Sequence, residues 1–290
     1  MKLLIAALLL GLVNGCLAAA DEPLQFLPAG TPPSVFGANA QKISLLLCNT
    51  GETNFDRPVR TQLVQTTSST AVPLGVEPWK QLRVLPSQTV LETAQLNFPP
   101  VRAETRFLVQ WLDDANRVLG VTSVLVYPTN LFQSLQPFLC QTNFGVLDPG
   151  NQLKPLLRAQ KISFTDLGQM NLENFSGRLA IIGPFQSQSQ APDDLARRIR
   201  AIAKKNVAVV WIQPPQPANP AAPLDWERKK IPPSFYSVQK SRTAVVVVQP
   251  DIVPSLPENP RSQIALIYCC KLALNPQPAV LPGLSPDFDH

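Results

Sequence analysis

Three aspartates could carry chemistry, because each stands at or just after the carboxyl end of a segment that we expect to be a buried strand. They are Asp148, Asp166 and Asp251. In an open parallel sheet, ligands bind in the crevice beyond the carboxyl ends of the strands. Paired carboxylates at that edge could act as general acid and base, or they could hold a divalent metal. The structural alternative is that Asp148 starts the turn of an Asp-Pro-Gly sequence and that Asp166 caps the segment after it.

Two glutamines, Gln213 and Gln249, follow the next strands that we expect at the same edge, and a proline-rich connection joins them. This connection, Pro214–Arg242, carries Trp226 and Tyr236 beside basic residues. A connection of this length is uncommon in a compact domain and is usually either functional or disordered. We therefore expect Gln213, Trp226, Tyr236 and Gln249 to bind a ligand or partner, with the connection as a lid or docking element. An inert loop that packs on the sheet is the alternative.

Histidine chemistry is excluded by the position of the single histidine, His290, which is the last residue. Chain termini rarely hold catalytic geometry, so Ser-His-Asp and Cys-His nucleophiles and His-ligated metal sites are not expected. We expect neither a metal nor a cofactor.

The cysteines of the exported chain are Cys48, Cys140, Cys269 and Cys270, and they lack the C-x-x-C spacing of a thiolate metal site. In an oxidising compartment, Cys140 could pair with Cys269 or Cys270, because both ends would fall in one domain. Buried free thiols are the alternative.

The first twenty residues have the composition of an export signal. Lys2 precedes the apolar run Leu3–Val13, and Ala18–Ala20 supplies the small residues at a cleavage site. Cleavage after Ala20 predicts a periplasmic or extracellular protein. The alternative is lipidation at Cys16, which would anchor the protein, and we expect contact with a membrane only through such an anchor.

Charge gives little reason to expect a nucleic-acid partner. The 25 Lys and Arg residues exceed the 20 Asp and Glu residues only slightly. One basic run occupies the polar face of an expected helix, where cations are usually solvated. Its members are Arg197, Arg198, Arg200, Lys204 and Lys205.

Alternation of apolar and polar residues predicts an all-β region from residue 41 to 128. No segment there has a helical stripe, and short strands separated by turns are typical of an antiparallel, immunoglobulin-like sandwich. The expected strands are Lys42–Cys48, Val59–Thr66, Gln81–Val84, Thr89–Phe98, Arg106–Leu112 and Val118–Tyr127. Trp111 should pack between the sheets, with sugar stacking as the alternative.

From residue 142 to 275, apolar strands alternate with helices, which predicts a doubly wound, mostly parallel sheet of flavodoxin-like type. The expected strands are Phe144–Leu147, Ile162–Thr165, Leu179–Ile182, Val207–Ile212 and Thr243–Val248, and the expected helices are Asn151–Gln160, a helix that starts at Pro192, and Pro260–Leu274. The remaining ranges are a signal peptide at 1–20, a linker at 21–40, a connector at 129–141 and an irregular tail at 276–290.

The segment Leu179-Ala-Ile-Ile-Gly-Pro184, together with this domain order, resembles exported bacterial proteins that pair an immunoglobulin-like module with a class I glutamine amidotransferase-like or flavodoxin-like domain. Active amidotransferases have a cysteine in a Gly-x-Cys-x-Gly elbow after this strand. Gly183-Pro184-Phe185 stands there instead, so the resemblance implies the fold without that activity.

The leading functional hypothesis is an exported, non-catalytic binding or assembly protein of the bacterial envelope, with an unidentified protein or carbohydrate partner. The alternative is a histidine-free carbohydrate-active enzyme or other hydrolase that uses Asp148, Asp166 and Asp251. Converging carboxylates in an open pocket would favour the enzyme, whereas capped and scattered ones would favour the binding protein.

Overall fold

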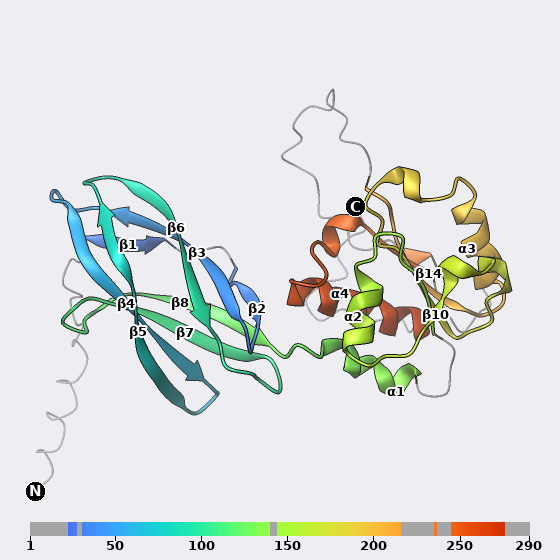
Figure 1. Ribbon diagram of the computed structural model, residues 1–290, viewed down its shortest axis with the longest axis horizontal. Helices are drawn as coiled ribbons and strands as arrows, with labels where there is room; N and C mark the ends of the chain where they lie inside the picture. Colours follow the sequence, from blue (N-terminus) through green and yellow to red (C-terminus); the bar gives the residue numbers. More distant parts are fainter. Residues whose placement is uncertain (1–22, 28–30, 140–143, 216–234, 237–244, 276–290) are drawn as a thin grey trace, which may run out of the picture. The chain divides into compact units, whose positions relative to one another are not determined.

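The computed structural model describes residues 23–27, 31–139, 144–215, 235–236 and 245–275, and the chain divides into two compact units (Figure 1). The first unit contains 40–98, 105–126 and the described residues up to Pro33. The second unit contains the residues from Tyr127 onward together with 34–39 and 99–104.

The first unit is built from two antiparallel sheets. One has the order β1 (Leu24–Leu27), β3 (Ala40–Asn49), β6 (Thr89–Asn97). The other has the order β8 (Val118–Tyr127), β7 (Thr105–Leu112), β4 (Phe55–Thr66), β5 (Ala71–Val84). The strand β2 (Ser34–Phe36) belongs to the residues that are grouped with the second unit. The strands expected from Lys42 to Tyr127 are therefore confirmed, with β4 and β5 longer than predicted.

The linker expected at 21–40 is wrong where the chain forms β1 and β2. Leu24 in β1 is only 1% exposed, and Leu24–Leu27 pairs with Asn49–Leu46 of β3. A strand of three or four residues is too short to show alternation of apolar and polar residues, so neither strand could be predicted.

Aromatic side chains join the inner faces of the two sheets. The Trp111 ring in β7 is fully buried and stacks on Phe26 of β1, with ring centroids 5.8 Å apart. The Trp111 indole Nε1 donates to the Thr122 hydroxyl at 2.9 Å, so its polar atom is satisfied inside the unit. This confirms Trp111 as a core residue and contradicts the sugar-stacking alternative.

The second unit contains a six-stranded sheet with the order β10-β9-β11-β12-β14-β13. Its strands are β9 (Phe144–Leu147), β10 (Thr165–Asp166), β11 (Leu179–Ile182), β12 (Ala208–Ile212), β13 (Phe235–Tyr236) and β14 (Val245–Val248). Five strands pair in parallel, and β13 adds to β14 in the antiparallel sense. Numbered along the chain, the parallel strands have the order 2-1-3-4-5. A mostly parallel sheet is thus confirmed.

Helices cover both faces of this sheet. The helices α2 (Leu153–Ala159) and α4 (Pro260–Leu274) and the 3-10 turn η1 (Leu131–Leu135) pack on one face through residues such as Leu157 and Leu266. The helix α3 (Leu195–Ala203) and the turns η2 (Leu167–Gln169) and η3 (Leu172–Asn174) pack on the other face. The short elements α1 (Gln136–Leu139), η4 (Gln188–Gln190) and η5 (Pro250–Ile252) complete the unit.

Two predicted elements differ in extent. The strand expected at Ile162–Thr165 is reduced to Thr165–Asp166, because Ile162 closes the turn after α2 by donating its N–H to the Leu157 carbonyl at 2.9 Å. The helix that we expected to start at Pro192 is α3, which begins at Leu195. The residues between Pro192 and Leu195 form a turn.

Candidate functional site

The carboxyl ends of the parallel strands meet at one edge of the second unit's sheet. Leu147 pairs with Ile182, Ile182 pairs with Trp211, and Ile212 pairs with Val248. The residues that follow these strands, including Asp148, Gln213 and Gln249, therefore lie along this edge, as predicted. The strand order reverses between β9 and β11, which is where such folds bind ligands.

Asp148 is a structural cap at this position. Its carboxylate is 4% exposed and accepts hydrogen bonds from three backbone N–H groups at the start of α2. Oδ2 accepts from Leu153 and Lys154 at 2.8 Å each, and Oδ1 accepts from Gln152 at 3.2 Å. A buried carboxylate that satisfies the free N–H groups of a helix stabilises that helix and has no exposed oxygen for a substrate.

Asp166 is tied to the same helix through Lys154. The Lys154 ammonium lies 2.7 Å from Asp166 Oδ1 and 2.8 Å from Oδ2, and Gly168 N–H donates to Oδ1 at 2.9 Å. The hydrogen bond from Lys154 is the main cause that holds the pKa of Asp166 below its usual value, against the opposing effect of burial. The carboxylate is thus ionised and paired, which is unsuitable for a general acid.

Asp251 differs from the other two because it is exposed, in the turn η5 that follows β14. Asp148 and Asp166 are linked through α2, whereas Asp251 follows a strand that lies beyond β11 and β12 in the sheet. No group of three or more His, Cys, Asp or Glu side chains in the described ranges could hold a metal ion. Asp148 and Asp166 are therefore already bonded within the unit, and Asp251 follows a different strand, so the three aspartates do not form a catalytic pair.

Backbone packing fills the reversal point between β9 and β11. Gly183 N–H donates to the Leu147 carbonyl at 2.7 Å, and Gly150 N–H donates to the Pro184 carbonyl at 3.1 Å. Gly183 has φ +100°, and a Cβ there would lie 2.8 Å from the Ile212 carbonyl oxygen, so glycine is needed. The Gln186 amide donates to the Gly150 carbonyl at 3.2 Å. These bonds connect the loop after β9 to the loop after β11, at the point where the strand order reverses.

The polar residues at β12 and β14 are more accessible. Gln213 and Gln249 are both half-buried, and the Gln213 N–H donates to the Val248 carbonyl at 2.8 Å. Trp211, two residues before Gln213, packs among the residues that contact α3. Because strand residues alternate between faces, Gln213 extends the row of Trp211 on that face.

Trp211 was not predicted as a site residue, yet it carries an unsatisfied polar atom. Its indole Nε1 is buried and has no hydrogen-bond partner among the described residues. A buried unsatisfied N–H costs about 1–3 kcal/mol and is rare in a folded protein. The only sequence signal was one aromatic residue in a run of aliphatic ones.

The structure describes the predicted partner residues in the proline-rich connection only in part. Trp226 lies outside the described residues. The backbone of Tyr236 belongs to β13 and pairs with Val245, and its side chain lies outside the described part of the chain.

The described cysteines are free thiols. Cys269 and Cys270 on α4 are buried, and burial raises the pKa of Cys269 to about 11 and that of Cys270 well above its usual value. Cys48 on β3 is half-buried. Cys140 and Cys16 lie outside the described residues, so the pairing with Cys140 and the lipidation of Cys16 stay predictions.

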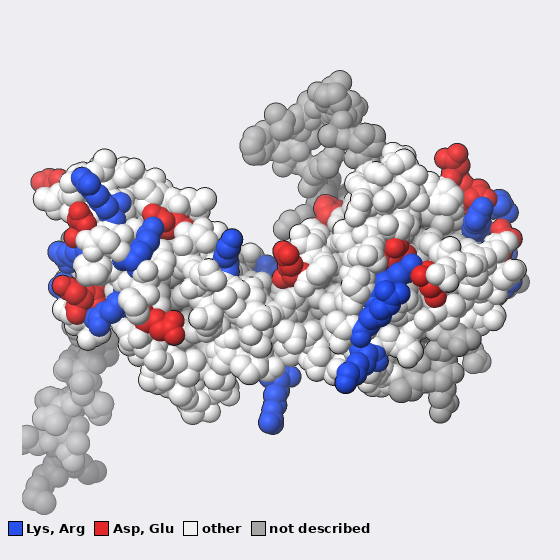
Figure 2. Space-filling view, viewed as in Figure 1, with Lys and Arg blue, Asp and Glu red and all other residues white. Residues whose placement is uncertain are grey.

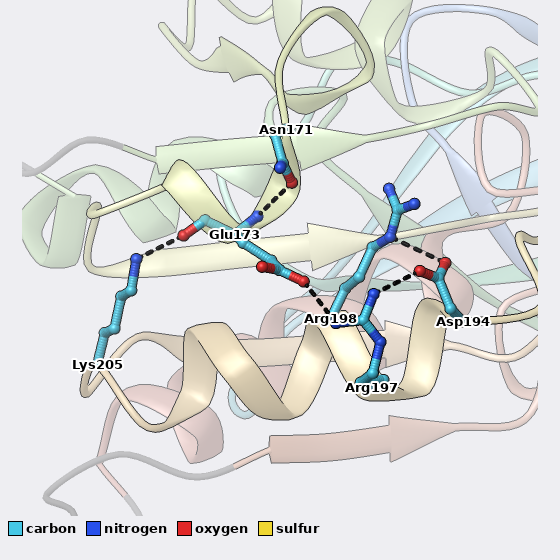
Figure 3. Close-up of polar contacts among 6 residues, drawn as sticks. All are labelled: Asn171, Glu173, Asp194, Arg197, Arg198 and Lys205. Atoms are coloured by element: carbon cyan, nitrogen blue, oxygen red, sulfur yellow. Dashed lines mark hydrogen bonds and ion pairs between the residues drawn. The ribbon is translucent and has the colours of Figure 1, made fainter.

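The basic face of α3 is partly neutralised by acidic neighbours (Figure 3). Asp194 accepts from Arg197 at 2.7 Å and from Arg198 at 2.9 Å, and Arg197 also reaches Glu173 at 3.1 Å. Lys205 donates to the Glu173 backbone carbonyl. Figure 2 shows blue and red side chains intermixed at the end of the second unit that carries α3. This arrangement attaches η3 to α3 and leaves no purely basic stripe for a polyanion.

No protein-family model matches the chain, and no curated protein matches it. Among solved structures, a Pseudomonas fluorescens alkylpurine DNA glycosylase bound to DNA is similar over 38% of this chain and 32% of its own length, at 14% identity and a TM-score of 0.29. A Niemann-Pick type C2 protein from the Japanese carpenter ant is similar over 33% of this chain and 78% of its own, at 7% identity and a TM-score of 0.27.

A β-glucosidase from Listeria innocua is similar over 36% of this chain and 16% of its own, at 14% identity and a TM-score of 0.26. The chain thus spans about a third of the glycosylase and about a sixth of the glucosidase. These likenesses are too weak to inform fold or function. Separately, no helix among the described residues is long and apolar enough to cross a membrane.

Proposed function

We propose that this protein is an exported, non-catalytic binding or assembly protein of the bacterial envelope. In this proposal the first unit is an immunoglobulin-like module. The second unit is a flavodoxin-like or amidotransferase-like domain without catalytic residues, and its 2-1-3-4-5 strand order supports this assignment.

The observation that carries the proposal is the bonding of Asp148. A carboxylate at the first strand end of such a sheet is well placed for chemistry, but here three backbone N–H groups use its oxygens and 96% of its surface is covered. Asp166 is likewise paired with Lys154. A hydrolase that works through these carboxylates would need at least one of them free to exchange a proton with a substrate.

The binding surface in this proposal is the end of β12 and β14 around Gln213 and Gln249, together with the proline-rich connection between them, whose Trp226 and Tyr236 are the other proposed partner residues. Two amide side chains that are accessible in part offer donors and acceptors without net charge. Such a surface suits a neutral polar partner, either a peptide backbone or a carbohydrate.

Site-specific photo-cross-linking in the producing cell tests this surface. A benzophenone amino acid at Gln213 should give a discrete cross-linked species, whereas the same amino acid at Arg200, an exposed position on α3, should not. Equal adducts at both positions, or none at Gln213, would count against this surface.

The enzyme alternative has its own test. The mature chain can be assayed against a panel of glycoside and ester substrates, with Asp251→Asn as the variant because Asp251 is the exposed aspartate at the edge. A turnover that this substitution removes would overturn the non-catalytic proposal.

Export and anchoring are proposed together with the function. Mass spectrometry of the mature protein should find an unmodified N-terminus at Asp21. A diacylated Cys16 would instead make the protein a lipid-anchored component of the envelope.

A further inference from the structure

A row of leucines crosses the outer face of the three-stranded sheet β1-β3-β6. Leu27 pairs directly with Leu46, and Leu46 pairs directly with Leu91, so the three side chains stand side by side on one face. Their exposed fractions are 36%, 42% and 72%. Single exposed leucines are common, but three in one cross-strand row form a continuous apolar strip.

The rest of this face is almost free of charge. Lys42 is the one charged side chain among the outward positions of β1, β3 and β6. The other outward residues are Gln25, Ala40, Ser44, Cys48, Thr89, Thr93, Gln95 and Asn97. By contrast, the strands β4, β5 and β7 of the other sheet carry the exposed charges Asp56, Arg57, Arg83 and Arg106.

We propose that this leucine face is a self-association surface, on which two copies of the chain pack sheet to sheet. The two-fold axis would lie in the interface along the leucine row, so that each leucine of the row meets its own counterpart. The proposal is independent of the binding surface at β12 and β14, because it concerns a different unit.

The charge pattern favours a second copy as the occupant. Lys42 is four residues from Leu46, which places it about 13 Å from the proposed axis. The two copies of Lys42 would therefore lie about 26 Å apart, on opposite sides of the axis. This separation is well beyond the screening length of about 8 Å at physiological salt, so the face can meet itself without charge repulsion.

The area of the leucine face indicates how strong the self-association should be. Strands of four, ten and nine residues spaced about 4.8 Å apart cover on the order of 350–400 Å². A standard specific interface buries about 800 Å² per partner. The dimer should therefore be weak and reversible, and it should form in the range of about 10–500 μM.

Sedimentation velocity of the mature chain in a reducing buffer tests the proposal. The wild type should shift from monomer to dimer across that concentration range, and Leu91→Lys and Leu46→Lys should each raise the dissociation constant at least tenfold. Val121→Lys on β8 is the matched control, because Val121 is 49% exposed but belongs to the other sheet. It should dimerise like the wild type.

Three outcomes would overturn the proposal. The first is a wild type that stays monomeric at 500 μM, and the second is an equal effect of Leu91→Lys and Val121→Lys. The third is co-sedimentation of monomeric protein with phosphatidylglycerol and phosphatidylcholine vesicles that Leu91→Lys removes, since this would assign the face to a lipid surface. Circular dichroism of each variant should match the wild type, because the substituted side chains are exposed.

Discussion

The two units of this protein use their sheets in opposite ways. In the first unit, β3 alternates between buried and exposed residues, so each sheet keeps one face toward water. In the second unit, every residue of β11 and β14 is buried, because helices and turns cover both faces. The first unit therefore exposes one face of its sheets to solvent, whereas β11 and β14 of the second unit are covered on both faces.

Buried polar side chains have a similar role in the two units. At the strand ends of the second unit, buried polar groups hold loops and helices in place, as Asp148 does for α2. In the first unit, the buried side chains of Asn49 and Asp113 hold turns in place through hydrogen bonds to the backbone. The Asn49 amide donates to the Thr53 and Val84 carbonyls, and Asp113 accepts from the N–H of Arg117.

The largest expected effect follows from the backbone packing at the end of β11. Gly183→Ala should lower the stability of the second unit by about 3 kcal/mol, because alanine is strained at φ +100° and its Cβ would meet Ile212. Gly75→Ala in β5 is the matched change in the first unit, where nothing lies within 4 Å of the added Cβ. It should be neutral or stabilise by up to about 1 kcal/mol.

Hydrogen exchange of the β9 and β11 amides, followed in increasing urea, measures the effect of Gly183→Ala in the second unit alone. Equal losses for the two glycine substitutions would mean that the strand ends are no more constrained than an exposed strand.

The next effect concerns the cap of α2. Asp148→Ala should cost about 2–3 kcal/mol, because three N–H groups lose their acceptor in a buried place. Asp251→Ala should change stability by less than about 0.5 kcal/mol, since Asp251 is exposed. Urea midpoints of the two variants give the comparison. A larger loss for Asp251→Ala would reverse our assignment of which aspartate is structural.

A smaller effect should appear as a pH dependence. The folded-state pKa of Asp166 is lowered, so its contribution to stability is present above the ordinary Asp pKa of about 3.9 and is lost as the pH falls through the folded value. Asp166→Asn should therefore remove part of the wild-type loss of stability that occurs as the pH falls below about 4. Because the pair is partly exposed, the difference should be about 1 kcal/mol or less.

Lys154→Met is the control for the pH experiment, since it removes the cause of the lowered pKa while keeping the length of the side chain. Thermal unfolding at pH 2.5 and pH 6 measures both variants. If Lys154→Met retained the full wild-type pH dependence, the ion pair would not be its source.

The smallest effect is expected on the exposed face of α3. Arg197 and Asp194 are solvent-exposed, so Arg197→Ala should lower the melting temperature only slightly, and added salt should reduce the difference. Arg200→Ala on the same helix is the control, because no ion pair is recorded for Arg200 within the described residues. A salt-independent loss for Arg197→Ala would indicate that the contact between α3 and η3 is a packing contact.

The strands of both units could be predicted because their periodicities are clear. The alternation of apolar and polar residues predicted β3 to β8. Continuous apolar runs such as Val245–Val248 predicted the buried strands of the parallel sheet. The location of the strand-end edge followed from the alternation of strands and helices. The roles of its residues did not, because only the structure reveals that the oxygens of Asp148 already have three donors.

The leucine row was not predictable for a different reason. Leu27, Leu46 and Leu91 come from strands that are not adjacent in sequence, and their alignment depends on the register of β3 with both β1 and β6. Each leucine alone reads as an ordinary position in an alternating pattern. The start of α3 was placed too early because Pro192 and two acidic residues are typical of a helix N-terminus as well as of a turn.

The two adjacent free thiols on α4 offer a way to follow the maturation of this chain. Before α4 reaches the sheet, Cys269 and Cys270 are open to alkylation and to mispairing with other thiols. After docking, burial and a high thiol pKa make both unreactive near neutral pH. Pulse alkylation of newly synthesised protein would therefore time the assembly of the second unit. The interval of thiol exposure would measure how long the chain depends on a reducing environment or a chaperone.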